Sequence, residues 1–301
     1  MTRPVGSLAV LVCTFRRPEL LAALLGSLAA QRTTRTFDVV VVDNDPEASA
    51  REIVLAAPLP VRYVVEPEPG IAAARNRALD EASDADTVVF VDDDETVDPG
   101  WLEALVATAE RFDADVVTGP VVAVLPPHAP RWVRRGGFHQ TPNPPEGTVL
   151  RAAKSGNTLV RTSALHADPP MRFDAAFSRS GGSDTELFWR MHQDGARIVW
   201  SHDAVAREPV PDSRLRPGWV VRREFRGGAA MGRMMLRSSP WPVVLVKGAL
   251  RTVVGAVRFV LGTLVNLGPR ASDTKVMLFG AGLVAAVLGV RTDEYRRGPK
   301  V

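Results

Sequence analysis

The chain has 301 residues, of which 46% are hydrophobic and 24% are charged, and its net charge is +3. A chain of this length and composition buries one large or two modest cores, which excludes a disordered or fibrous protein. A single cysteine, Cys13, excludes an intramolecular disulfide and favours a reducing compartment such as a bacterial cytoplasm.

The first half of the chain alternates apolar, β-rich runs with segments of helical period, which is typical of βαβ units in a sheet covered by helices. The expected strands are 7–13, 38–42, 61–65, 87–91 and 115–118. The expected helices lie near 18–30, 47–56, 71–83 and 99–111. The first apolar run is short and is followed at once by arginines, so it predicts a strand and not a signal peptide. The proline-rich segment 120–148 predicts a long loop, with at most an edge strand, of the kind that often forms a lid.

Polar residues follow the predicted strands, at the edge where ligands bind in α/β sheets. They are 14–17, 43–45, 66–70 and 92–94. Asp92 and Asp94 lie two residues apart, so in extended backbone they point the same way and repel each other unless a cation is near. Two carboxylates suit Mg²⁺ or Mn²⁺, which fills its other positions with water and phosphates. The alternative is a solvated turn, in which Glu95 and Asp98 are acids at the start of a helix.

A second group of acids opens a later helix. Ser183-x-x-Glu186 matches a capping box, and the helix should run through Met191 to Gly195. Capping is therefore one role open to Glu186. Asp184 lies in the first turn, where the helix N-terminus keeps a carboxylate ionised.

Six segments in order resemble the inverting nucleotide-sugar glycosyltransferases of the GT-A fold, in the bacterial exopolysaccharide group (family 2). They are VCTFRRPELL, VVDND, GIAAARNRAL, FVDDD, GNTLVR and GGSDTELFWR. The resemblance spans roughly residues 7–210 and implies a Rossmann-like nucleotide-diphospho-sugar transferase domain. It implies that the donor is bound by Thr14, Phe15, Arg16, Asp43, Arg75, Asp92 and Asp93. Asp43 would accept a hydrogen bond from the base, and Asp92 and Asp94 would hold Mn²⁺ or Mg²⁺.

The resemblance also implies the catalytic and acceptor residues. Asp184 would be the general base that deprotonates the acceptor hydroxyl, and a single displacement inverts the anomeric carbon. Candidate acceptor residues are Asn157, Trp189 and Glu186, although Asn157 has the alternative of a strand-turn role. His202 or Glu208 could occupy a position that some relatives fill with a histidine, and we expect His202 as a further metal ligand.

The chain departs from the family pattern in two places. Ser183 replaces the first acid of the pair that many relatives have. Residues 222–226 do not match the Q-x-x-R-W motif of processive relatives, which favours the addition of a single sugar.

The tail of the chain is basic and apolar. Residues 1–206 carry 20 Lys and Arg and 28 Asp and Glu, whereas residues 207–301 carry 17 and 6, a net charge of +11. On a helix over 243–267, Lys247, Arg251 and Arg258 fall within about 40° of one another, which suits a helix lying on an anionic membrane. The run 276–290 would be about 22 Å long as a helix and should dip into the membrane without spanning it. The alternative is that both helices cover the catalytic domain of a soluble protein.

These observations predict a glycosyltransferase domain over 1–210 and a helical, membrane-associating region over 211–301. The expected activity is metal-dependent, non-processive transfer of one sugar from a UDP- or GDP-type donor to a glycan or polyprenyl-linked acceptor. We expect a cytoplasmic protein that is peripheral on the inner face of the cell membrane, with no nucleic-acid partner. Two other functions compete: a haloacid-dehalogenase-like phosphatase with Asp92 as nucleophile, and a non-enzymatic membrane-binding module.

Overall fold

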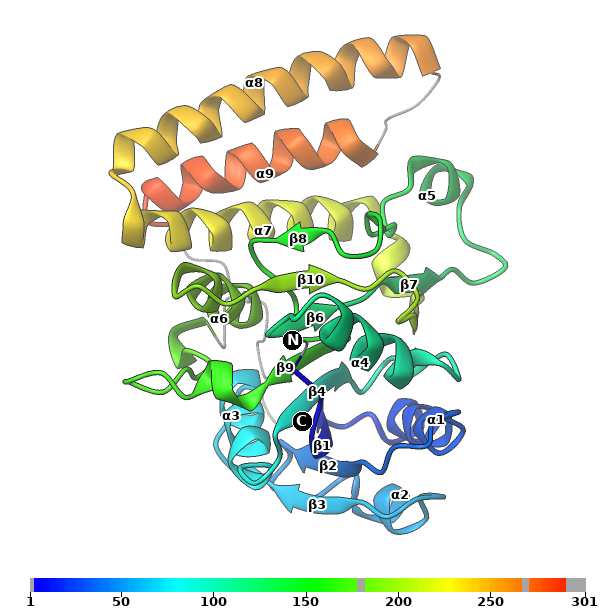
Figure 1. Ribbon diagram of the computed structural model, residues 1–301. Coiled ribbons are helices and arrows are strands. Elements are labelled where there is room, and N and C mark those ends of the chain that lie inside the picture. The colour runs from blue at the N-terminus through cyan, green and yellow to red at the C-terminus, as the bar shows by residue number, and fades with distance from the viewer. Residues whose placement is uncertain (1–2, 178–181, 267–270, 291–301) are drawn as a thin grey trace. The chain divides into compact units, whose positions relative to one another are not determined.

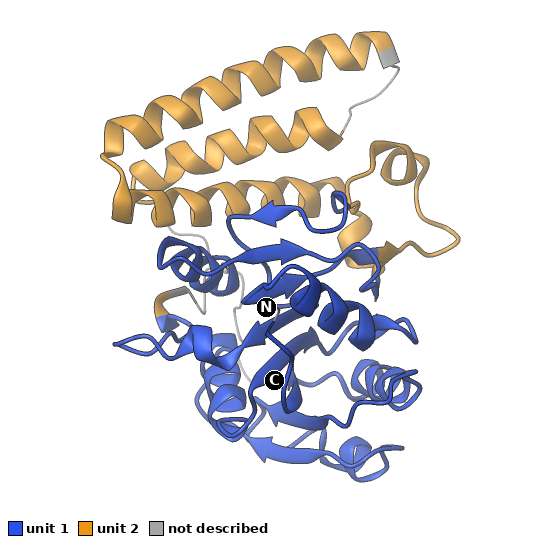
Figure 2. Ribbon diagram, viewed as in Figure 1, with its two compact units in different colours: residues 1–122, 141–175, 183–209 blue, residues 123–140, 176–182, 210–301 orange. Residues whose placement is uncertain are grey.

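A computed structural model describes residues 3–177, 182–266 and 271–290 (Figure 1). The chain forms two compact units (Figure 2). Unit 1 comprises residues 1–122, 141–175 and 183–209, and unit 2 comprises 123–140, 176–182 and 210–301. Unit 2 therefore takes two segments from the middle of the chain besides residues 210–301, and the predicted division at residue 210 stays a prediction.

Unit 1 is built on an eight-stranded sheet in the order β3-β2-β1-β4-β9-β6-β10-β8. Its strands are β1 (Leu8–Thr14), β2 (Asp38–Asp43), β3 (Arg62–Val65), β4 (Thr87–Asp92), β6 (Val116–Thr118), β8 (Val149–Leu150), β9 (Thr158–Arg161) and β10 (Ile198–Trp200). The first four are parallel to one another, whereas β9 runs antiparallel between β4 and β6. The prediction of an α/β fold is confirmed, and all five predicted strands are present.

Alternate residues of each central strand pack into two different cores, because successive side chains of a strand point to opposite faces. In β1, Val10 and Val12 join one core, whereas Ala9 and Leu11 join the other. The first core is completed by α1 (Pro18–Ala29) and α4 (Trp101–Arg111), and the second by α3 (Ile71–Glu81) and α6 (Ser183–Gln193). The sheet is thus buried on both faces, which leaves its edges for chemistry.

The remaining elements of the two units are short, apart from three helices in unit 2. The short ones are α2 (Arg51–Leu55), β5 (Thr96–Val97), β7 (Val121–Val124), α5 (Arg131–Gly136), η1 (Thr162–Leu165), η2 (Ala175–Phe177), β11 (Ala206–Pro209) and η3 (Asp212–Leu215). A second sheet has the order β5-β11-β7. The predicted loop over 120–148 is partly wrong, because it contains the helix α5, whereas β7 is an edge strand of the kind that the prediction allowed.

Three helices dominate unit 2: α7 (Pro217–Ser238), α8 (Trp241–Asn266) and α9 (Ala271–Val287). Helix α9 packs against both α7 and α8. Glycines make this close approach possible, since a Cβ on Gly228 would lie 2.1 Å from the carbonyl oxygen of Phe279, and one on Gly282 would lie 2.2 Å from that of Phe225. Every residue of α9 is buried or half-buried except Ser272.

The packing of α9 corrects one expectation about the tail. We expected 276–290 to dip into the membrane, but residues 276–287 lie in α9, which packs against two other helices. Within the described ranges, no helix combines the length and the apolar character that crossing a membrane requires.

Candidate functional site

Three polar residues end neighbouring parallel strands at one edge of the sheet of unit 1. Thr14 ends β1, Asp43 ends β2 and Asp92 ends β4. Thr14 is paired in register with Asp43, and Cys13 with Asp92. The predicted convergence of these residues at the carboxyl edge of the sheet is therefore what the strand register produces.

The acidic run after β4 is held by two arginines. Nη2 of Arg75, on α3, lies 3.2 Å from Oδ1 of Asp92. Nη1 of Arg17 lies 3.1 Å from Oδ1 of Asp93 and 3.0 Å from Oδ2 of Asp94. The Thr14 hydroxyl donates to Oδ2 of Asp93 at 2.8 Å. The two arginines thus reduce part of the repulsion between these carboxylates. From the sequence, we expected only a metal ion in this role.

The pKa values of these acids reflect their crowding. The pKa of Asp92 is raised, first by its removal from water and then by the charges of Asp94 and Asp184, while Arg75 opposes the shift. Burial raises the pKa of Asp93 to about 6, against the opposing effects of Arg17 and the Thr14 hydroxyl. The site is consequently a place where ionised carboxylates are costly, and where added positive charge would be favourable.

The predicted nucleotide-binding residues on the first two strands form a second ion-paired group. Nε of Arg16 lies 2.8 Å from Oδ2 of the buried Asp45, and its guanidinium lies 5.3 Å from the centre of the Phe15 ring. Arg16 adopts a left-handed backbone, with φ of 55°. Both Phe15 and Arg16 keep exposed surface, so they are available to a ligand.

Asp43 lies deeper than its neighbours. Its side chain accepts hydrogen bonds from the backbone N–H groups of Asp45 and Ala50 and from the Tyr63 hydroxyl, and it has no exposed surface. These hydrogen bonds show that Asp43 stabilises the loop over 45–50. Its predicted hydrogen bond to a nucleotide base stays a prediction.

Asp184 lies in the first turn of α6, close enough to Asp92 for its charge to raise the pKa of that residue. Oδ2 of Asp184 accepts a long hydrogen bond of 3.4 Å from the backbone N–H of Ser155. The carboxylate is half-buried, so it combines a fixed position with access to solvent. The predicted base and the predicted metal-binding acids therefore belong to one site.

Gly156, which follows Ser155, packs directly against the acids of this site. A Cβ on Gly156 would lie 2.8 Å from Oε1 of Glu95 and 2.9 Å from Oδ2 of Asp92, so only glycine fits without displacing these carboxylates. Oε2 of Glu95 accepts a hydrogen bond from the backbone N–H of Asp92 at 3.3 Å. Burial, and then the charge of Asp92, raises the pKa of Glu95. Glu95 is thus a buried support for Asp92, and the idea of a solvated turn is wrong.

Asn157 corrects a prediction about the acceptor. It has no exposed surface, its amide group donates to the carbonyl oxygens of Pro120 and Ala204, and its Oδ1 accepts from Nε1 of Trp101. Its φ of 64° lies in the left-handed region that asparagine tolerates. Of the two roles considered for Asn157, the structure therefore supports the strand-turn role. Its side chain is not available to an acceptor.

The other predicted acceptor and metal residues are less central. Glu186 is buried and pairs with Arg190 across one helical turn at 2.8 Å, so an acceptor role for it is wrong. Trp189 is half-buried on α6, and its role stays a prediction. His202 is exposed. In the described part of the chain, no set of three or more His, Cys, Asp or Glu side chains is arranged to hold a metal ion, which argues against His202 as a third ligand.

Two carboxylates are nonetheless a sufficient protein contribution for Mg²⁺ or Mn²⁺ when phosphates supply further oxygens. Asp92 and Asp94 are both half-buried, so they keep part of their surface open to a ligand. The residues present therefore fit a divalent cation that arrives with a phosphate-bearing donor.

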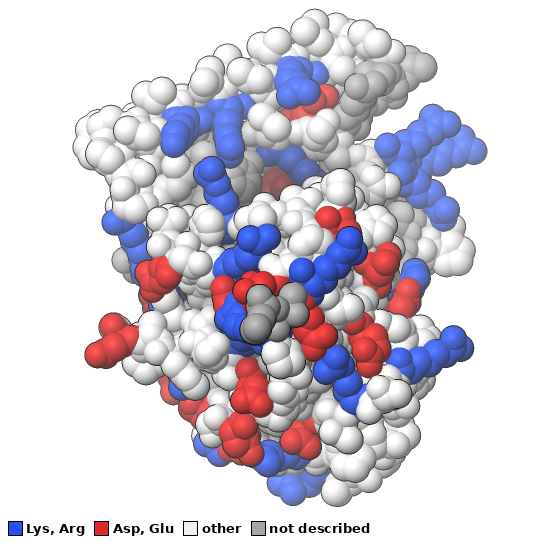
Figure 3. Space-filling model, viewed as in Figure 1, with Lys and Arg blue, Asp and Glu red and all other residues white. Residues whose placement is uncertain are grey.

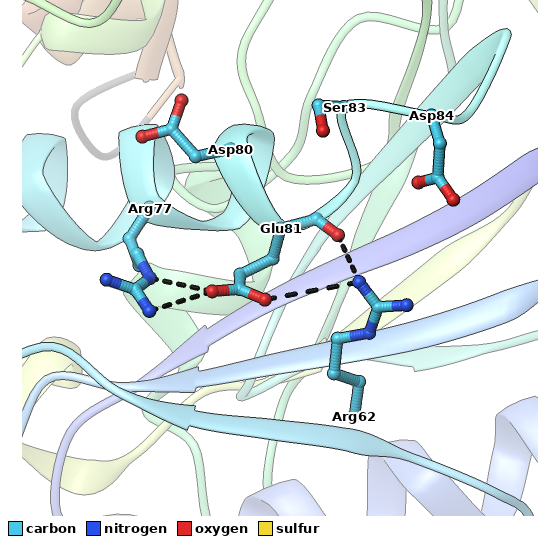
Figure 4. A pocket seen from close by; sticks show the side chains of 6 residues that line it. All are labelled: Arg62, Arg77, Asp80, Glu81, Ser83 and Asp84. Atoms are coloured by element: carbon cyan, nitrogen blue, oxygen red, sulfur yellow. Dashed lines mark hydrogen bonds and ion pairs between the residues drawn. The ribbon is translucent and has the colours of Figure 1, made fainter.

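A hollow elsewhere on unit 1 has no part in this site. It measures about 410 Å³ and is lined by Arg62, Arg77, Asp80, Glu81, Ser83 and Asp84 (Figure 4). These residues lie at the start of β3, along the end of α3 and before β4, which is the opposite edge of the sheet. Glu81 occupies both arginines, at 2.8 Å from Arg77 and 4.0 Å from Arg62. The arginines that line the hollow are therefore already paired with an acid that also lines it.

Several site residues were not predicted. Arg17 belongs to the quoted VCTFRRPELL segment, but its ion pairs with Asp93 and Asp94 depend on a contact across 76 residues of chain. Asp45 was present in the VVDND segment without an assigned role, and Glu95 was considered only as an acid at the start of a helix. For Gly156, the only available signal was its position in the GNTLVR segment.

Comparison with known proteins identifies the family. Residues 9–167 match the model of glycosyl transferase family 2. The succinoglycan biosynthesis protein ExoM of Rhizobium meliloti is 42% identical over 230 residues, which cover 74% of each chain. Glycosyltransferase AglE of Haloferax volcanii is 24% identical over 236 residues, covering 76% of this chain and 74% of its own.

Solved structures support the same fold. The crystal structure of S. aureus TarS 1–349 in complex with UDP has a TM-score of 0.57 at 17% identity, covering 98% of this chain and 94% of that one. Its complex with UDP-GlcNAc gives a TM-score of 0.55 at 16% identity, over 94% and 92% of the two chains.

Proposed function

The chain belongs to glycosyl transferase family 2, and from this membership we propose that it transfers one sugar from a UDP- or GDP-type donor to an acceptor hydroxyl, with inversion. That it is a glycosyltransferase follows from the family and from its relatives. The observation that carries the finer proposal is the meeting of Asp92, Asp94 and Asp184 at the carboxyl edge of the sheet. The phosphatase alternative is not favoured, because Asp92 ends the fourth strand and is paired with Arg75.

Donor binding would use the two ion-paired groups at this edge. Phe15 and Arg16 offer an aromatic face and a guanidinium to the nucleotide, and Arg75 is placed beside Asp92. Asp92 and Asp94 would hold Mn²⁺ or Mg²⁺ together with the diphosphate. When bound, such an ion would neutralise the charge that develops on the departing nucleoside diphosphate.

Asp184 would act as the general base. It lies in the first turn of α6, and the backbone N–H of Ser155 donates a hydrogen bond to one of its carboxylate oxygens. In the reaction it would take the proton of the acceptor hydroxyl while that oxygen attacks the anomeric carbon and the nucleoside diphosphate leaves. A single displacement of this kind gives inversion.

The acceptor that we propose is a glycan or a polyprenyl-linked sugar in polysaccharide biosynthesis. The 42% identity to a succinoglycan biosynthesis protein supports this class of acceptor. We further propose that the protein is cytoplasmic and peripheral on the inner face of the cell membrane, where an anionic lipid surface meets its basic tail. The proposal includes no nucleic-acid partner.

The test uses the full chain with a panel of UDP- and GDP-sugars and Mn²⁺, and measures release of nucleoside diphosphate. Asp184→Asn should lower turnover by about 10²- to 10⁴-fold while leaving the affinity for the nucleoside diphosphate within about twofold. Asp194→Asn is the control, because Asp194 is exposed just beyond the other end of α6. Normal turnover in Asp184→Asn would overturn the base assignment. Release of inorganic phosphate from a phosphomonoester, without nucleoside diphosphate release, would overturn the transfer reaction itself.

A further inference from the structure

Helix α8 carries a continuous apolar stripe that the fold leaves exposed. Its members recur at intervals of three and four residues, and at 100° per residue they fall within about 100° of the helix circumference. Each is between 52% and 64% exposed, except for the last at 74%: Val246, Leu250, Val253, Val257, Val260, Leu261 and Leu264. In Figure 3 the surface of the long helices of unit 2 is largely white, with a few Lys and Arg side chains. An exposed apolar strip of this length marks an interaction surface.

The opposite face of α8 is committed to α9. A Cβ on Gly255 would lie 2.3 Å from the backbone nitrogen of Met277, and one on Gly248 would lie 3.0 Å from the carbonyl oxygen of Gly280. Larger side chains cannot replace these glycines at such distances. Rotation of α8 to bury its valines and leucines against α9 is therefore blocked, and the stripe must face outward.

Cations line one flank of the stripe. Lys247, Arg251 and Arg258 follow one another along α8, which contains no Asp or Glu. The Arg251 guanidinium lies 5.5 Å from the centre of the Phe279 ring, and Nε of Arg258 lies 3.6 Å from Oδ1 of Asp273. Both partners belong to α9, so they hold these cations beside the apolar stripe. Trp241, at the start of α8, is 60% exposed, and tryptophan favours membrane interfaces.

We propose that this outward face of α8 docks on an anionic lipid bilayer, with the helix lying in the plane of the interface. The apolar stripe would enter the boundary between headgroups and acyl chains, and the flanking cations would meet lipid phosphates. A helix of 26 residues is about 39 Å long and presents the whole stripe at one depth when it lies flat. The biological use of the docking rests on the proposed function, since it brings the enzyme to a lipid-linked acceptor.

Charge favours a bilayer over a second copy of the chain. The described residues of unit 2 include 14 Lys and Arg but only 3 Asp and Glu. Two such surfaces placed face to face would bring like charges together, whereas anionic lipids complement them.

The experiment measures flotation of the full-length protein with vesicles of equimolar phosphatidylglycerol and phosphatidylcholine. The variant Leu250→Glu/Val257→Glu should reduce the bound fraction by at least about tenfold, because charges replace apolar side chains in the stripe. Both positions are exposed, so circular dichroism should show unchanged thermal unfolding. The matched control is Leu55→Glu/Val149→Glu, at two exposed apolar positions of unit 1, 81% and 56% exposed, and it should float like the wild type.

Three outcomes would overturn the proposal. The first is equal flotation of the wild type and the α8 variant. The second is equal loss in the control. The third is a wild-type dimer in light scattering that the α8 variant dissociates, without change in flotation. Nucleoside diphosphate release in the absence of vesicles separates this inference from the proposed function, because it should be the same in the wild type and the α8 variant. Absence of that release in the wild type, with flotation intact, would count against the transfer reaction alone.

Discussion

The carboxyl edge of the sheet in unit 1 and the outward face of α8 in unit 2 depart from ordinary burial in opposite directions. At the first, charged side chains are buried: Asp45 is 1% exposed, Glu95 3% and Asp93 5%. At the second, apolar side chains are exposed, up to 74% at Leu264. Proteins rarely bury acids without partners or expose long apolar strips. The first departure fits the proposed binding of a phosphate-bearing donor, and the second fits the proposed docking on a lipid surface.

The largest effect should come from removing one acid at the charged edge. Asp94→Ala should lower turnover with Mn²⁺ by about 10³-fold, because the donor diphosphate would lose a carboxylate that shares its cation. The measurement is nucleoside diphosphate release across a Mn²⁺ titration. Asp84→Ala, in the hollow at the opposite edge, should behave like the wild type. A wild-type Mn²⁺ titration for Asp94→Ala would contradict the metal assignment.

A smaller effect should follow from adding one methyl group beside the acids. Gly156→Ala should lower turnover by about 10- to 100-fold, because the new Cβ must displace the carboxylates of Asp92 and Glu95. Both displaced groups are side-chain ends, so the free energy of unfolding should change by less than about 1 kcal/mol. Steady-state kinetics and urea unfolding measure the two quantities.

Gly26→Ala is the matched control for this variant, since Gly26 lies in α1 and a Cβ there would have no neighbour within 4 Å. It should preserve turnover. Full activity in Gly156→Ala would show that Asp92 tolerates displacement, and that the site is less constrained than its contacts indicate.

The burial of Asp93 predicts a dependence of stability on pH. Its pKa is about 6 in the folded protein and 3.8 ordinarily, so the folded state binds more protons between these values. The free energy of unfolding should therefore fall as pH rises from about 4 to 6. In Asp93→Asn this fall should be smaller by about 1–2 kcal/mol, as urea unfolding across that range would measure. An identical pH dependence in the variant would mean that Asp93 does not titrate in this window.

The smallest effect on stability should come from a substitution in the apolar stripe of α8. Leu264→Ser should change the free energy of unfolding by less than about 0.5 kcal/mol, because that side chain has little packing to lose. Leu24→Ala, fully buried in α1, should cost about 2–5 kcal/mol. Thermal and urea unfolding of both variants give the contrast. A large loss for Leu264→Ser would mean that the stripe is packed in the folded protein.

Much of unit 1 could be predicted because strand and helix periods dominate its first half. A short continuous apolar run, such as the one that contains Val10 and Leu11, is typical of a strand buried on both faces, and these two residues do pack into different cores. Helix α7 lies in the region 211–301 that was predicted to be helical, but its bounds were not predicted, and its Gly227, Gly228 and Gly232 are unfavourable by local propensity. In the structure these glycines admit α9, so tertiary packing overrides propensity.

For the site, the positions after each strand could be predicted, whereas their partners could not. The spacing of Asp92 and Asp94 is local information. The pairing of Arg17 with both following acids, and the approach of Gly156, depend on contacts between distant segments. Asn157 misled for the same reason, since an asparagine in a loop suggests a ligand until its three buried partners are known.

Strand β9 lies between β4 and β6 in the sheet, although it follows both of them in the chain. During synthesis on a ribosome, β4 and β6 emerge first and cannot pair with each other in the final arrangement. The slot between them stays vacant until residue 161 has left the exit tunnel, and the same insertion delivers the 155–157 turn to the acids. A nascent chain that pauses earlier would display Asp92, Asp93 and Asp94 and yet lack Gly156, which packs against Asp92 in the finished fold.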